Sequence, residues 1–252
     1  MRPDAAVARY VFRLLLRSRL AVLMLAAGLV LIVGSFVLTW LTPGTERRTF
    51  LDVTYLGIEW MAILAPILGS TILQIQEFDQ RTLWLILVRP PGRASFARGR
   101  FLGLAASSAC ITLACGLVLA GLLAVTGGLP ERYLGPVLVA ALGEVLILSA
   151  IGGLVTFLTT SYLTSLLVQL GIVILGYLSP VLPYLARKAT VPLLDPLIRA
   201  VYWVVPHLSD FAVREFTEPA ETWYLAALTG YAVLYAGVAV VVSMLAFRRR
   251  DV

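Results

Sequence analysis

Residues 77–100, EFDQRTLWLILVRPPGRASFARGR, lie between two long apolar runs and gather charge in a chain that otherwise carries little. The stretch holds five arginines and two acidic residues. Pro90 and Pro91 end any helix that begins at Glu77, because proline has no backbone N–H and its ring clashes with the preceding turn. Residues 93–100 can then begin the next helix. We expect a short, rigid segment that joins two membrane-spanning helices and contacts a partner in the cytoplasm.

The composition around this stretch is that of a membrane protein. Of 252 residues, 60% are hydrophobic and 13% are charged, whereas soluble domains have roughly 45–50% apolar and 25% charged residues. The net charge of +6 comes from basic residues that flank apolar runs, as expected when positive charge orients a membrane protein. This distribution argues against a nucleic-acid partner.

The hydropathy pattern predicts an all-α membrane protein with six transmembrane helices in a single domain, 1–252, since a spanning helix takes about 20 apolar residues. The expected spans are 20–41, 55–76, 101–126, 134–159, 163–184 and 223–247. Residues 159–162, TTSY, carry no charge. Two alternatives therefore remain at this boundary: a tight hairpin or a re-entrant pair of half-spans.

Two segments outside the spans have their own pattern. Residues 4–19 place Arg9, Arg13 and Arg17 on one helical face opposite apolar residues, which predicts an amphipathic helix in the membrane interface in contact with lipid; a plain basic flank is the alternative. Residues 186–222 are expected to be extracytoplasmic. Within them Asp195-Pro196 predicts the cap and first residue of a short helix between spans five and six, followed by an irregular piece, 207–216.

Several residues of the central stretch resemble the cytoplasmic loop of ABC-2 type transporter permeases. They are Glu77 and Thr82, the turn Arg89-Pro90-x-Gly92-Arg93, and the pair Gly99-Arg100, where the family more often ends with lysine. Residues 205–211, VPHLSDF, are similar to the outer segment of the permease subgroup linked to copper-enzyme maturation and gliding motility.

The resemblance implies the permease subunit of an ABC transporter in the bacterial cytoplasmic (inner) membrane, with both termini in the cytoplasm and export as the expected direction. Thirteen basic residues lie on the proposed inner side and seven on the outer side, in agreement with the positive-inside rule. A separate ATPase subunit would bind ATP and Mg, and a second copy or a paralogous permease would complete the membrane part. The expected contacts with the ATPase are Glu77, Asp79, Arg81, Thr82, Arg89, Pro90, Gly92 and Arg93.

The chain itself is expected to be neither an enzyme nor a cofactor-binding protein. It has no G-x-x-x-x-G-K-[ST] motif for nucleotide phosphates. Its one histidine, His207, has no carboxylate or thiol cluster at ligand spacing, so no metal site is predicted. A membrane enzyme acting on lipid needs such a cluster at one membrane face and is the weaker alternative. A non-transporting anchor that passes ATPase motion to a periplasmic accessory protein is the other.

Two acidic residues fall inside expected spans and are candidates for a translocation path. Glu144 lies ten residues into the fourth span, about 15 Å deep at 1.5 Å per residue, where an ionised carboxylate costs roughly 2.5–3.5 kcal/mol. It either lines the path or is protonated and hydrogen-bonded to a serine on a neighbouring helix. Glu59 is shallower and is expected to pair with Arg47 or Arg48 at the interface.

Overall fold

The computed structural model describes residues 3–41, 46–79, 93–125, 131–188, 194–212 and 221–249. Across these residues the structure is 92% helical and contains no strand, which confirms the all-α prediction. The elements are α1 (Pro3–Leu16), α2 (Arg19–Leu41), α3 (Glu46–Asp79), α5 (Arg93–Val125), α6 (Glu131–Leu158), α7 (Tyr162–Tyr177), α8 (Leu182–Lys188), α9 (Leu194–Val204), the 3-10 helix η1 (Leu208–Phe211) and α10 (Thr222–Arg249).

Four helices within the described ranges, α3, α5, α6 and α10, are long and apolar enough to cross a membrane. The number rises to six if two bent pairs each count as one span, namely α1 with α2 and α7 with α8. The fold is therefore that of a multi-pass membrane protein.

Two helices begin well before the spans expected from hydropathy. Helix α3 starts at Glu46 rather than at residue 55, and α5 starts at Arg93, in agreement with the expectation that residues 93–100 begin the next helix. Charged residues such as arginine and glutamate form helices well, so an apolar run marks the part of a helix that lies in lipid and not its ends. Within the predicted loop 77–100, residues 77–79 and 93–100 are helical.

The expected fifth span over 163–184 is not one continuous helix. Helix α7 ends at Tyr177 and is followed by α8 at a bend of 81°. Pro180 has no N–H to donate to the carbonyl of Gly176, and the N–H of Ser179 takes that acceptor at 3.3 Å. The sixteen residues of α7 rise about 24 Å, less than the roughly 30 Å of a hydrocarbon core, so α7 is too short to cross alone.

Residues 159–161 form the turn between α6 and α7, at the predicted boundary of the fourth and fifth spans. The Thr159 hydroxyl donates to the carbonyl of Val155 at 2.9 Å. The carbonyl of Thr159 accepts a hydrogen bond from the side-chain amide of Gln74 at 3.3 Å. Side chains therefore satisfy the backbone groups that the helix end leaves open, and the turn is fastened to α3.

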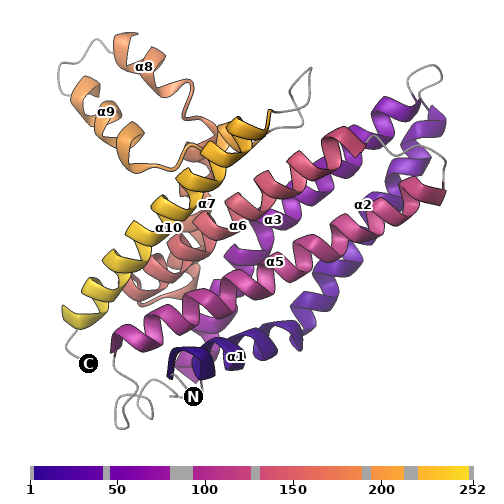
Figure 1. The fold of residues 1–252 in the computed structure, drawn as a ribbon. Helices are drawn as coiled ribbons and strands as arrows, with labels where there is room; N and C mark the ends of the chain where they lie inside the picture. Colours follow the sequence, from indigo (N-terminus) through magenta and orange to yellow (C-terminus); the bar gives the residue numbers. More distant parts are fainter. Residues whose placement is uncertain are drawn as a thin grey trace.

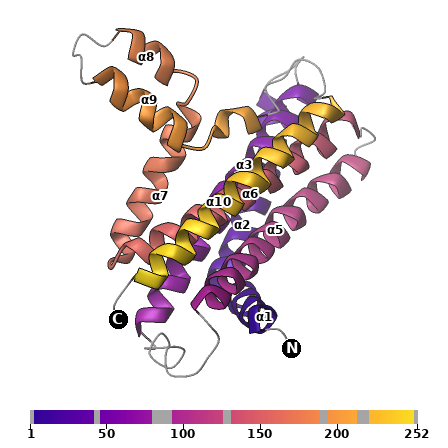
Figure 2. The same cartoon turned by 60° about the vertical axis from the view of Figure 1, so that its left-hand side comes forward.

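The helices form a bundle in which α10 and α3 both pack along α6, α2 packs along α3, and α1 packs across the beginning of α5. The start of α1, the end of α10 and the helix ends that flank residues 80–92 gather at one end of the bundle (Figures 1 and 2). Helices α8 and α9 stand apart from the bundle, away from the two termini (Figure 2).

Between α9 and α10 the chain returns to the core. Leu208 and Phe211 of η1 are buried between α6 and α7, and a Cβ at Gly143 of α6 would lie 2.5 Å from the Phe211 ring. An irregular piece was expected over 207–216, and its burial was not predicted. Asp195 is not a cap as predicted, since α9 begins one residue earlier, and its carboxylate accepts a hydrogen bond from Arg199 Nε at 2.9 Å.

Candidate functional site: a buried ion pair beside residues 80–92

An ion pair joins the two helices that lead into and out of residues 80–92. Arg100 Nη1 of α5 lies 3.3 Å from Glu77 Oε2 of α3, and the two side chains are 2% and 16% exposed. The guanidinium also lies over the ring of Phe157 at the end of α6, 4.8 Å from its centroid, within the range of a cation–π interaction. Three helix ends are thus held together at one point.

The stability of the protein is expected to depend on both members of this buried ion pair. Removing one partner of a buried ion pair leaves a charge without compensation in a poorly solvating environment. Phe157 in turn packs on Phe96 of α5, with ring centroids 6.5 Å apart. The ends of α3, α5 and α6 are therefore expected to move as one unit when force acts on the segment between Asp79 and Arg93.

Helix α1 is seated on the same end of α5 through two glycines. A Cβ at Gly99 would lie 2.7 Å from the carbonyl oxygen of Asp4, and one at Gly103 would lie 2.6 Å from Val11 Cβ. Only glycine allows this approach, as in the small-x-x-x-small contacts of membrane helices. Asp4 accepts a hydrogen bond from the Ser95 hydroxyl and lies 3.4 Å from Arg98 Nη2.

The outer face of α1 carries Arg9 and Arg13, and Arg17 follows directly after the last residue of the helix, Leu16. Arg9, Arg13 and Arg17 are exposed, whereas Val11 and Leu15 are buried. Helix α1 thus turns an apolar face to the bundle and a basic face outward. Its location in a membrane interface stays a prediction.

The expected ATPase contacts are distributed unevenly over the structure. Glu77 lies on α3 with its carboxylate directed to Arg100. Asp79 is the last residue of α3 and Arg93 the first of α5. The other five expected contacts fall outside the described residues; they are Arg81, Thr82, Arg89, Pro90 and Gly92.

Glu144 lies halfway along α6 and is 1% exposed. Its Oε1 accepts a hydrogen bond of 2.6 Å from the Tyr177 hydroxyl of α7, so a tyrosine supplies a donor where a serine was predicted. Glu59 of α3 is also buried, at 7% exposed. Its predicted partners, Arg47 and Arg48, lie on the same helix, at least about 16 Å away along the axis, so that predicted pairing is wrong.

A second polar contact, which sequence reasoning missed, links α3 to α7. The Ser70 hydroxyl lies 2.8 Å from Gln169 Oε1, and Gln169 Nε2 donates to the Ser165 hydroxyl at 3.1 Å. Gly152 of α6 makes room for this contact, since a Cβ there would lie 2.9 Å from Ser70 Oγ. A glutamine inside an apolar run was the available signal.

The pairing of Arg100 with Glu77 was also missed, although both residues belong to the central stretch. The spacing G-x-x-x-G over 99–103, within an apolar helix, predicts a close contact with another helix, and α1 makes that contact. Over the described ranges, no group of three or more His, Cys, Asp or Glu residues could hold a metal ion.

A scan against protein-family models and a search of curated proteins each gave no match to this chain. The fold and composition define its class, a helical protein that passes through a membrane several times.

Proposed function

We propose that this chain is the membrane subunit of an ABC-2 type ABC transporter, located in the bacterial cytoplasmic membrane with both termini in the cytoplasm. It would move a substrate outward with ATP that a separate ATPase subunit hydrolyses, alongside a second copy or a paralogous permease. The observation that carries the proposal is the Arg100–Glu77 pair over Phe157, which couples three helix ends at the entry and exit of residues 80–92.

The arrangement suits the transmission of force from a soluble partner. A displacement of residues 80–92 acts directly on the last turn of α3 and the first turn of α5. The ion pair joins the last turn of α3 to the second turn of α5, so the displacement passes along both helices and, through Phe157, to α6. Helix α1 follows because Gly99 and Gly103 hold it against α5.

A translocation path would open between α6 and α7, at the Glu144–Tyr177 hydrogen bond. It joins α6 to α7, and Phe211 packs on the neighbouring Gly143. A relative movement of α6 and α7 would break this bond and give the carboxylate access to water. The non-transporting anchor would use the same ion pair but would need no such opening.

Copurification tests the proposal. The tagged chain is purified from its native membrane, and a soluble ATPase is expected to accompany it. Reversal of charge in Arg81→Glu together with Arg89→Glu is expected to release the ATPase, because both arginines lie in the proposed contact segment.

Arg98→Glu is the matched control, since it reverses an exposed arginine that contacts Asp4 of the same chain. It is expected to retain the ATPase. The proposal fails if no ATPase accompanies the unmodified chain, or if the double variant binds the ATPase as well as the control does while both keep the thermal midpoint of the parent protein.

A further inference from the structure

The α8–α9 pair exposes large apolar side chains although it lies outside the helix bundle. Tyr184, Leu197, Val204 and Trp203 are 55%, 59%, 72% and 80% exposed. Tryptophan and tyrosine gather at the two membrane–water interfaces, where an apolar ring and a polar atom are both accommodated. In a chain whose neighbouring helices cross a membrane, a surface of this kind is suited to the interface and poorly suited to water.

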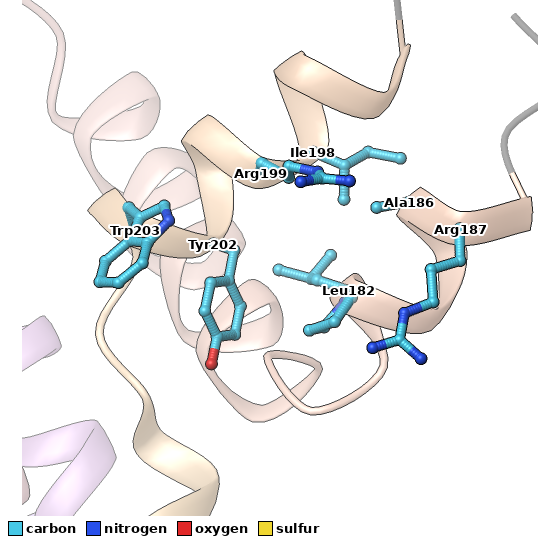
Figure 3. A pocket seen from close by; sticks show the side chains of 8 residues that line it. Leu182, Ala186, Arg187, Ile198, Arg199, Tyr202 and Trp203 are labelled. Atoms are coloured by element: carbon cyan, nitrogen blue, oxygen red, sulfur yellow. The ribbon is translucent and has the colours of Figure 1, made fainter.

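A pocket of about 360 Å³ opens between the two helices. It is lined by Leu182, Pro183, Ala186, Arg187, Ile198, Arg199, Tyr202 and Trp203. Leu182 and Ala186 form a buried apolar floor, at 7% and 5% exposed. In the view of Figure 3 the guanidinium groups of Arg187 and Arg199 and the hydroxyl of Tyr202 surround Leu182.

The net charge of helices α8 and α9 together is positive. Arg187, Lys188 and Arg199 are opposed by a single acid, Asp195, over the described residues of α8 and α9. Arg199 uses only its Nε in the hydrogen bond to Asp195, and a guanidinium offers five N–H donors. Lys188 Nζ lies 4.6 Å from the centroid of the Tyr184 ring, which holds a third positive charge beside the pocket.

We propose that the α8–α9 pair is a binding site for an anionic phospholipid. The phosphate of the headgroup lies against Arg187 and Arg199, which match the geometry of a phosphate better than lysine does. The apolar floor and Trp203 accommodate the upper part of the acyl chains. A basic rim, an apolar floor and an exposed aromatic surface together fit a lipid rather than a soluble anion, which would use only the rim.

This proposal depends on the bundle crossing a membrane and not on an ATPase partner. It therefore survives if copurification fails, and it can fail while copurification succeeds. The probe is Trp203 fluorescence, measured as the difference between the full-length chain and its Trp203→Phe variant.

The chain is reconstituted in phosphatidylcholine vesicles that contain brominated phosphatidylglycerol or, separately, brominated phosphatidylcholine. Trp203 is expected to be quenched more by the anionic lipid. Each basic residue near an anionic surface contributes roughly a fivefold preference, so Arg187→Gln with Arg199→Gln is expected to reduce the preference by on the order of 25-fold.

The matched control changes two exposed arginines at the other end of the molecule, Arg9→Gln with Arg13→Gln, and is expected to leave the Trp203 signal unchanged. Soluble glycerol phosphate in excess is expected to have no effect. The proposal is overturned by equal quenching from the two lipids, by absence of quenching from both, by a preference that the Arg187/Arg199 variant retains, or by release of the lipid with glycerol phosphate, which would indicate a site for a soluble anion.

Discussion

Arg98 and Arg100 lie two residues apart on α5, and their surroundings differ sharply. Arg98 is 51% exposed and lies near Asp4, whereas Arg100 is 2% exposed and lies near Glu77. Water screens the first pair, and exposed pairs contribute about 0–1 kcal/mol. The second pair has little water around it, so each charge depends on the other. A comparison of substitutions at these two arginines therefore tests how much the buried ion pair contributes to the stability of the bundle.

Replacement of Arg100 by methionine is expected to destabilise the protein by roughly 3–5 kcal/mol, because Glu77 would remain buried without its counter-charge. The measurement is the thermal midpoint of the purified chain in detergent. Arg98→Met is expected to change stability by less than about 1 kcal/mol. The double variant Arg100→Met with Glu77→Gln is expected to recover part of the loss. Equal effects of the two single variants would contradict the role assigned to the buried pair.

At the residue scale, sequence analysis identified which charges needed a partner but not which partner they have. Glu144 was expected either to line a translocation path or to hydrogen-bond a serine on a neighbouring helix, and the structure gives it a donor inside the bundle. The donor is Tyr177, from a helix that follows later in the chain, and nothing local to Glu144 distinguishes this tyrosine from a nearby serine. Such pairings follow from how helices face one another, which one sequence does not reveal.

At the scale of helix packing, two consecutive glycines of α6 have different roles. A Cβ at Gly152 would lie 2.9 Å from Ser70 Cβ and 3.1 Å from Gln169 Oε1, whereas a Cβ at Gly153 would meet nothing within 4 Å. The first glycine is needed for the contact between α3 and α7. The second is not constrained by its neighbours.

Gly152→Ala is expected to destabilise the protein by about 1–3 kcal/mol, the usual cost of overpacking, because the added methyl group displaces Ser70 and Gln169. Gly153→Ala is expected to be neutral or stabilising by up to about 1 kcal/mol, since alanine is the better helix former. Thermal midpoints of the two variants in the same detergent provide the comparison. Similar midpoints for both would show that α3, α6 and α7 do not meet closely at Gly152.

The helices themselves were largely predictable, and their ends were not. Hydropathy located all the long helices, because about 20 apolar residues have few alternatives to a spanning helix. It did not locate the start of α3 at Glu46, which depends on helix-forming polar residues to which an average of hydropathy is insensitive. The average does not locate the end of α7 at Tyr177 either, but Pro180 and Pro183 in the sequence predict that the span frays there.

At the scale of the whole molecule, the turn at residues 159–161 and the beginning of α10 are expected on opposite sides of the membrane. Gln74 fastens the turn to the last part of α3, at the end of the bundle that holds both termini (Figure 1). Helix α10 begins at Thr222 and returns to that end at Arg249. The six-span topology makes this arrangement testable.

Ser161→Cys and Thr222→Cys are a matched pair for this purpose, because both replace a small exposed hydroxyl residue. They are made in a chain whose two free cysteines, Cys110 and Cys115, are changed to alanine. A membrane-impermeant maleimide is expected to label the Thr222 variant in intact cells and the Ser161 variant only in inverted vesicles. Labelling of both from one side would contradict an odd number of crossings between the two positions.

The close seat of α1 on α5 sets an order of events during biosynthesis. Helix α1 leaves the ribosome before α5, so its docking surface at Gly99 and Gly103 does not yet exist. At roughly 5–20 residues per second, the intervening chain takes on the order of ten seconds to make. During that interval the N-terminal helix waits undocked, and chaperones or the insertion machinery have access to it before the finished protein conceals its apolar side.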